Sequence, residues 1–165
     1  TNNDDGWRTA TDLSAKGVAV TAVIDTRSGS ALAEIPGAQI IMGARVMNTS
    51  GRRGLTSVTL TDHQTIPVEC LAVSGGWNPN VHLTCHQRGY PVWRDDIAAF
   101  VPGADLPPGM SVAGAANGNL TMASALVEGL RTANKLVEDL GFAPVTLTAP
   151  KAEDEPHDSA AFWHV

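Results

Sequence analysis

A chain of 165 residues, of which 43% are hydrophobic and 17% charged, has the composition of a globular α/β protein and is too apolar to be disordered. Its 17 acidic residues outnumber the 11 basic ones, and because no basic cluster occurs, the sequence argues against a nucleic-acid partner. No apolar run reaches the roughly 18 residues that cross a bilayer, and the first residues resemble no signal peptide. We therefore expect a cytoplasmic protein without membrane contact.

Both ends of the sequence look cut from a longer protein. The chain does not begin with Met, and its last residues, AFWHV, end on an apolar run without a turn signal. We expect a fragment that depends on neighbours outside it.

The N-terminal part predicts a helix followed by a strand. Trp7, Ala10 and Leu13 recur at helical spacing, and Gly17 follows where a helix would end. The run GVAVTAVIDTR then has the β-branched pattern of a parallel strand buried on both faces, and it carries Asp25 near its end. A helix that leads into such a strand is typical of half a βαβ unit.

Several short strands are predicted next. The runs at 39–42, 44–49 and 55–60 are strands, and the turn SGRRG joins the last two into a hairpin. The segment IPVECLAVSGG predicts a further apolar strand that ends in a double glycine.

The C-terminal half predicts one long helix. Residues 81–110 are turn-rich and weakly periodic, so we expect them to run over a surface or to join two parts. The segment SVAGAANG predicts a short strand that enters a turn of small residues, and residues 119–141 have the strongest helical periodicity of the chain. The Pro-, Ala- and acid-rich residues from Phe142 onward predict a linker.

The first helix start is a candidate phosphate turn. In a dinucleotide-binding βαβ unit, a glycine-rich turn approaches the pyrophosphate, and an acid about 20 residues later binds the ribose. Asp25 lies at about that spacing from Gly6, but Asp4 and Asp5 would repel a phosphate. We predict that these two acids cap the helix, that this Rossmann-like half no longer holds a dinucleotide, and that Asp25 is a solvated acid at the strand end.

The turn before the long helix is the stronger candidate. Residues 114–118 are small, so the backbone N–H groups of the turn and of the helix start can approach an anion. A plain strand-to-helix connection explains the same pattern, and both interpretations stay open at this point.

Metal and catalytic motifs are missing from the sequence. His82, Cys85 and His86 supply at most three ligands from one loop, without a second cluster to complete a zinc site, so we expect no metal. There is no GxSxG motif and no P-loop, and we expect no catalytic residue in this chain. Cys70 and Cys85 lack CxxC spacing and are expected to be free thiols.

Four segments occur in a fixed order over nearly the whole chain: NNDDGWRTATDL, AVSGGWNPNVHL, AGAANG and AFWHV. Together they resemble the α-subunits of heterotetrameric sarcosine oxidases. The pair CLAVSGGWNPNVHL and GMSVAGAANG also resembles segments of the glutathione-reductase-like flavoproteins that bind two dinucleotides. The resemblance implies an α/β fold of incomplete Rossmann-like parallel sheets with a β-hairpin.

The resemblance also implies three parts. Residues 1–80 would be most of an inserted second nucleotide-type domain whose first strand is missing. Residues 81–141 would be the return segment of the first dinucleotide-binding domain, and residues 142–165 a linker toward an absent C-terminal domain.

In the family that the chain resembles, the α-subunit holds a noncatalytic NAD. The resemblance implies NAD contacts along one turn, from Gly114, Ala115, Asn117, Gly118, Leu120, Thr121 and Met122. It further implies a complex with β, γ and δ subunits and the rest of the α chain, with FAD and FMN bound. That complex converts sarcosine to glycine, formaldehyde or methylenetetrahydrofolate, and hydrogen peroxide, with tetrahydrofolate as co-substrate.

Two other functions remain open from the sequence. The chain could be a noncatalytic structural or interaction piece with a vestigial nucleotide site, or a module that reduces a flavin with NAD(P)H. The double glycine at Gly75 and Gly76 fits all three interpretations. Tightly bound nucleotide would favour the family interpretation, and flavin reduction by added NADH would favour the reductase.

Overall fold

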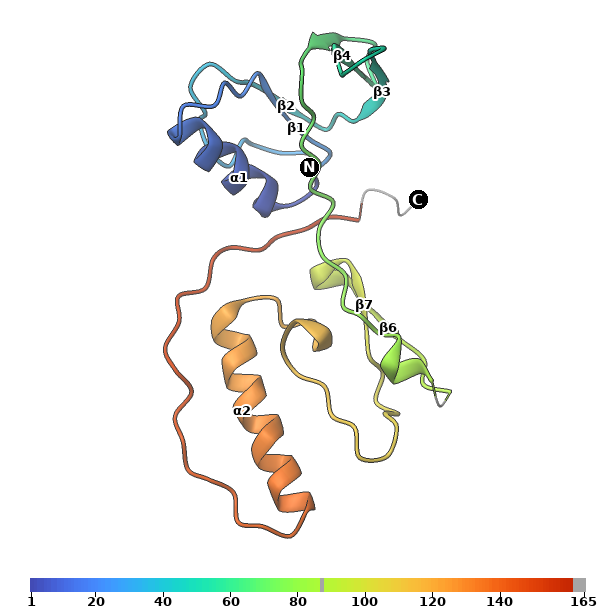
Figure 1. Ribbon diagram of the computed structural model, residues 1–165, viewed down its shortest axis with the longest axis vertical. Coiled ribbons are helices and arrows are strands. Elements are labelled where there is room, and N and C mark those ends of the chain that lie inside the picture. Colours follow the sequence, from blue (N-terminus) through green and yellow to red (C-terminus); the bar gives the residue numbers. More distant parts are fainter. Residues whose placement is uncertain (87, 162–165) are drawn as a thin grey trace. The chain divides into compact units, whose positions relative to one another are not determined.

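The computed structural model describes residues 1–86 and 88–161 and shows a mixed α/β chain (Figure 1). The chain divides into unit 1, which is Thr1–Gly76 with the segment that begins at Asp158, and unit 2, which is Trp77–His157. Parallel and antiparallel strand pairs both occur. The predicted α/β class, with parallel strands and a β-hairpin, is confirmed.

Helix α1, Asp4–Ala15, begins one turn before the predicted helix. Asn3 is its N-cap, because its Oδ1 accepts a hydrogen bond from the Gly6 N–H at 3.2 Å. The prediction that Asp4 and Asp5 cap the helix is wrong: both lie inside the first turn, where carboxylates still suit the helix dipole. Gly17, with a φ of +83°, follows the helix as predicted.

Strands β1, Ala22–Asp25, and β2, Gln39–Met42, form a parallel pair. Thr1 lies on the other edge of β1. Its amino group donates to the Ile24 carbonyl at 2.7 Å, and the Thr26 N–H donates to the Thr1 carbonyl at 2.9 Å. These two bonds have the pattern of a parallel ladder, although the sheet of β1 contains only β2 as a second strand.

Both faces of β1 are covered, as predicted for a parallel strand. On one face Val23 packs with Trp7 of α1 and with Ile35. On the other face Ala22 and Ile24 pack against a second apolar cluster. The strand is shorter than the β-branched run that predicted it, because the ladder begins at Ala22.

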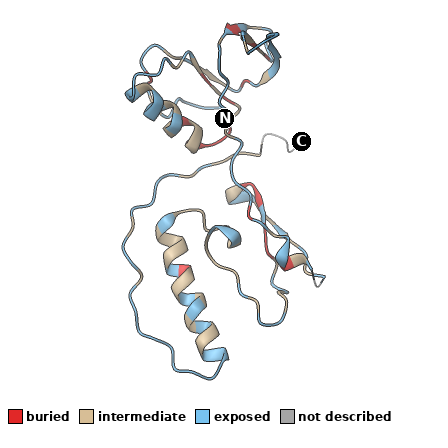
Figure 2. Ribbon diagram, viewed as in Figure 1, coloured by how far each residue is buried: buried red, intermediate tan, exposed pale blue. Residues whose placement is uncertain are grey.

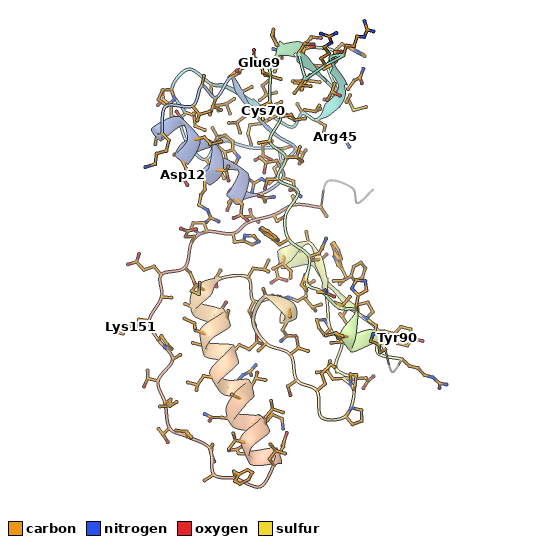
Figure 3. The ribbon with its side chains drawn as sticks, in the orientation of Figure 1. Asp12, Arg45, Glu69, Cys70, Tyr90 and Lys151 are labelled. Atoms are coloured by element: carbon orange, nitrogen blue, oxygen red, sulfur yellow. The ribbon has the colours of Figure 1, made fainter. Side chains whose placement is uncertain are left out.

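The second cluster belongs to a three-stranded antiparallel sheet. Its strands are β3, Val46–Ser50, β4, Ser57–Leu60, and β5, Thr65–Pro67, so the predicted hairpin is confirmed. The long strand predicted over IPVECLAVSGG is wrong, since only its first residues pair. The Val68 N–H makes one further bond to the Thr56 carbonyl at 3.2 Å, and Val73 beyond it is 80% exposed. Cys70 projects from this same segment (Figure 3), and both cysteines are free thiols.

Unit 2 contains a hairpin that the sequence did not predict. Its strands β6, Val92–Arg94, and β7, Ala99–Val101, are joined by a 3-10 turn, and Ala98 closes that turn in the left-handed region with a φ of +48°. Strands of three residues between prolines are too short to show alternation, which is why the segment resembled a loop.

Helix α2, Met122–Asp139, follows a 3-10 turn, η3, Gly114–Asn117. The long predicted helix is confirmed, and Gly141 ends it with a φ of +83°. The short strand predicted before η3 is wrong, because residues 111–113 are assigned to no strand. Figure 2 shows that most of α2 is half-buried or exposed; its buried residue, among the described positions, is Glu128.

Residues 142–157 form no helix or strand, and the chain then returns to unit 1 at Asp158. Most of the terminal AFWHV lies outside the described residues. The assignment of 1–80, 81–141 and 142–165 to parts of two dinucleotide-binding domains stays a prediction.

Candidate functional site

At the end of β1, Asp25 is 0% exposed and fully hydrogen-bonded. Its carboxylate accepts from the Trp7 Nε1 at 2.6 Å, from the Arg27 N–H at 2.9 Å and from the Arg27 guanidinium at 2.8 Å. The prediction of a solvated acid is wrong. Sequence spacing placed Asp25 at the strand end, but it did not show that Trp7 of α1 would cover the carboxylate.

Arg27 joins the two acids of this region. Besides Asp25, its guanidinium donates to Asp4 Oδ1 at 2.7 Å. Burial on its own would raise the pKa of Asp25, but the hydrogen bonds from Arg27 and Trp7 outweigh it and hold that pKa below its ordinary value. Burial would likewise lower the pKa of Arg27, and the bonds to both acids raise it instead. Asp4 and Asp25 are thus both paired with Arg27 within the protein.

Residues 158–160, here named the terminal strap, cover the turn before α1. The Asp4 N–H donates to the Asp158 carbonyl at 3.1 Å, and the Asp158 N–H donates to Asp4 Oδ2 at 2.8 Å. The Asn2 side chain donates to the Ala160 carbonyl at 2.6 Å, and Asn2 and Asn3 are both fully buried. Protein groups therefore fill the turn in which a dinucleotide-binding unit would hold a pyrophosphate.

In unit 2 a buried carboxylate organises the turn that was predicted as the anion site. Glu128 of α2, 7% exposed, accepts from the Gly114 N–H and from the Asn117 side chain, both at 2.7 Å. Burial would raise the pKa of Glu128, but hydrogen bonds from Asn119, Asn117 and Gly114 lower it. Glu128 was not among the site residues predicted from the sequence. One signal could have identified it. Glu128 is a lone acid one turn after Ser124 and Ala125, and these small residues leave room for η3.

The two glycines of this turn have structural roles. Gly114 and Gly118 have φ values of +66° and +82°, which other residues rarely adopt. A Cβ on Gly118 would lie 2.6 Å from Val101 of β7, so this glycine also allows close packing on the hairpin. By contrast Ala115 is exposed, and Met122, which begins α2, is 63% exposed.

The N-terminus of α2 already holds a carboxylate. Its N-cap, Thr121, makes no side-chain bond to the helix backbone. Instead the Thr121 hydroxyl donates to Asp154 Oδ2 at 3.0 Å, and the Ala123 N–H donates to Asp154 Oδ1 at 2.7 Å. An open cavity of about 480 Å³ lies beside this contact, lined by Asn119, Ala123, Ser124, Val127, Glu128, Arg131 and Asp154.

The structure brings the predicted site residues together over η3 and the start of α2. Asn117 and Gly114 direct polar groups to Glu128, while Ala115 and Met122 are exposed. Their contact with NAD stays a prediction. Within residues 1–86 and 88–161, no three His, Cys, Asp or Glu side chains gather as metal ligands, and no helix combines the length and apolarity of a membrane span.

No family model matches the sequence. The whole chain aligns with the sarcosine oxidase subunit alpha of Rhizobium meliloti at 33% identity over 170 residues. The chain is a relative of one segment of the sarcosine oxidase α-subunit. The α-subunit of Corynebacterium sp. strain U-96 is 35% identical over 94% of the chain, and that of strain P-1 is equally similar. The chain spans only 17% to 18% of the length of these α-subunits.

Proposed function

We propose that this chain is part of a sarcosine oxidase α-subunit and helps to hold a noncatalytic NAD at the turn between η3 and α2. The observation that carries the proposal is the similarity to α-subunits over the whole chain. An α-subunit of this kind contributes to an oxidoreductase complex. In this proposal the chain supplies no catalytic residue and supports the complex by holding the nucleotide.

The chemistry of the α2 N-terminus supports an anion there. Thr121 and Ala123 donate to a carboxylate, and the same two donors suit a phosphate oxygen of NAD. Ala115 and Met122, in η3 and at the start of α2, are both exposed. In this proposal Gly114, Asn117, Gly118 and Leu120 shape the turn, with Glu128 holding its first N–H.

The remaining chemistry is assigned to the rest of the complex. In this proposal the flavins of the complex would accept two electrons from the CH–NH group of sarcosine, and molecular oxygen would take these electrons up as hydrogen peroxide. Water would then release glycine and formaldehyde, or tetrahydrofolate would take up the one-carbon unit in place of that release. The partners are the β, γ and δ subunits and the rest of the α chain, and the location is cytoplasmic.

A noncatalytic structural piece is the second candidate, and unit 1 favours it. Asp25 and Asp4 are paired with Arg27, and the terminal strap covers the turn before α1, so this half has protein groups where a dinucleotide would bind. One observation distinguishes the two candidates: bound nucleotide supports the first, and its absence supports the structural piece. A flavin that is reduced by added NADH would instead point to a reductase.

The test uses the full-length subunit in its complex, purified as the wild type and as Ala115→Leu. Released nucleotide is identified by mass and counted per subunit. We expect NAD in the wild type and a loss of most of it in Ala115→Leu, because bulk on this exposed turn holds a ligand away from the backbone. Ala133→Leu, on an exposed position of the same helix, is the control and should keep its nucleotide. A wild type without nucleotide, or a full complement in Ala115→Leu, would overturn the proposal.

A further inference from the structure

We propose that a second cavity of unit 2, between α2 and the segment before η3, binds the phosphate group of a small phosphate monoester. The cavity has a volume of about 250 Å³. It is lined by Leu106, Ser111, Val112, Arg131, Thr132 and Lys135. None of the residues that we propose as NAD contacts lines this cavity, so the inference does not depend on the proposed function.

The lining of the cavity has a charge opposite to that of the unit around it. Acidic residues outnumber basic ones in unit 2, yet the lining contains an arginine and a lysine and no acid. Arg131 and Lys135 are four positions apart in α2, which places their side chains on the same face of the helix. Two positive charges beside one cavity match a phosphate monoester, which carries close to two negative charges above about pH 6.

The donors of the lining suit a phosphate better than a carboxylate. The Arg131 guanidinium can donate two parallel hydrogen bonds to an oxyanion, and the Lys135 ammonium adds a second charge. Thr132 of α2 and Ser111 of the neighbouring segment contribute hydroxyl groups. A phosphate monoester offers three terminal oxygens to these four groups, whereas a carboxylate offers two.

The ion pairs that now hold the two cations are weak. Arg131 lies 3.7 Å from the Glu128 carboxylate, which is longer than a hydrogen bond, and Glu128 already accepts two bonds of 2.7 Å from η3. Lys135 lies 3.1 Å from Asp139, and their side chains are 71% and 57% exposed. Exposed ion pairs contribute little free energy, so both cations can turn toward a phosphate at little cost.

The remaining lining residues limit the size and chemistry of the ligand. Leu106 and Val112 supply an apolar wall from the segment that runs beside α2 (Figure 1). That wall suits an aliphatic part of the ligand next to its phosphate. The volume is below the range of roughly 300 to 1,000 Å³ that is usual for sites of drug-sized ligands, so we expect a molecule much smaller than a dinucleotide.

The test uses the complex with the full-length subunit, without NAD, and glycerol 3-phosphate as the probe. Lysine side chains are acetylated with acetic anhydride at increasing probe concentration, with chloride at equal ionic strength as the reference, and the products are identified by mass. We expect saturable protection of Lys135, because its ammonium contacts the bound phosphate. Lys151, an exposed lysine of the same unit that does not line the cavity, should react at an unchanged rate.

Variants locate the binding site. Arg131→Gln should weaken the dissociation constant taken from the Lys135 protection curve by about tenfold or more, since hydrogen bonds to a charged group are lost. Arg131→Lys keeps the charge without the paired donors and should fall between Arg131→Gln and the wild type. Lys151→Gln removes a charge from the same unit outside the cavity and should leave the constant unchanged.

Three results would overturn the inference. The first is equal protection of Lys135 and Lys151, or protection that does not saturate, because either indicates a general effect of anions. The second is an unchanged dissociation constant in Arg131→Gln. The third is protection by acetate, at equal ionic strength, that is as strong as protection by glycerol 3-phosphate. Because NAD is absent from these measurements, their failure is distinguishable from failure of the proposed function.

Discussion

The N-termini of α1 and α2 hold negative charge in different ways. Beside α1, Asp25 and Asp4 share Arg27, and Asn3 caps the helix from a fully buried position. At α2 the first turn has no acid, and the exposed Asp154 reaches it from residues 142–157, which form no helix or strand. One helix start is closed by a buried network, and the other is covered by a single surface residue.

The difference separates a structural junction from a candidate binding site. In the buried network, each group that loses its hydrogen-bond partner stays buried where water cannot replace that partner. Opening the network therefore costs much free energy. At the surface contact, water or a ligand replaces the carboxylate with a small change in free energy. Two helix starts with similar sequence signals are therefore expected to behave oppositely toward a nucleotide.

Asp25→Ala should have the largest effect. It leaves the Trp7 indole N–H without its buried acceptor and removes one of the two acids that pair with Arg27, at a cost of about 3 to 5 kcal/mol. Native-state hydrogen exchange on the full-length subunit should show that loss of protection in α1 and β1. Asp12→Ala, on the exposed side of α1, is the matched control. Equal protection in the two variants would mean that the network does not close unit 1.

Glu128→Ala should have the next largest effect, now in unit 2. The Gly114 N–H and the Asn117 amide lose their shared acceptor, so the turn should be destabilised by about 2 to 3 kcal/mol, the range for hydrogen bonds to a charged group. Hydrogen exchange at Gly114 measures the change. Glu138→Ala, an exposed acid of the same helix, should leave that exchange rate as it is. If both variants behave alike, Glu128 does not organise the turn.

Substitutions at two glycines should change the stability by smaller amounts, with opposite signs. Gly118→Ala places a Cβ 2.6 Å from Val101 at a φ of +82°, and we expect a loss of about 1 to 2 kcal/mol. Gly129→Ala lies in the interior of α2 with open space around it, and we expect a gain of about 0.5 to 1 kcal/mol from helix propensity. Denaturant midpoints of the two full-length variants would show the opposite shifts. Shifts of the same sign would contradict this account.

A fall in pH should gradually lower the stability of the region around Asp25 and of the region around Glu128. The pKa values of Asp25 and Glu128 lie below their ordinary values of 3.8 and 4.5 in the folded chain. A lowered folded pKa contributes stability that is complete above the ordinary value and is lost as the pH falls through the folded value. Hydrogen exchange should therefore show constant protection above about pH 5 and a loss below it, after correction for the intrinsic rates. In Glu128→Gln the part of the loss that is measured at Gly114 should disappear.

Much of the fold could be predicted from the sequence, because its signals were local. The apolar spacing of α2 and the turn SGRRG each specified an element without help from distant residues. The β6–β7 hairpin was missed, since strands of three residues carry no periodic signal. The strand predicted beyond Pro67 failed because pairing depends on a neighbour, which local pattern does not supply.

The candidate site could be predicted only in part for the same reason. The small residues around Ala115 identified the turn, and the structure places them at the start of α2. Glu128 and Asp154 were missed because their contacts are with distant positions: Glu128 bonds Gly114, 14 positions away, and Asp154 bonds Ala123, 31 positions away. The solvated state expected for Asp25 was wrong because the Trp7 and Arg27 contacts are tertiary.

Hydrogen exchange of the nucleotide-stripped complex, with and without NAD, tests the contrast between the two helix starts most directly. The contrast predicts slower exchange over residues 114–123 on addition of NAD and no change over residues 1–7. A change at residues 1–7, or none at residues 114–123, would contradict it.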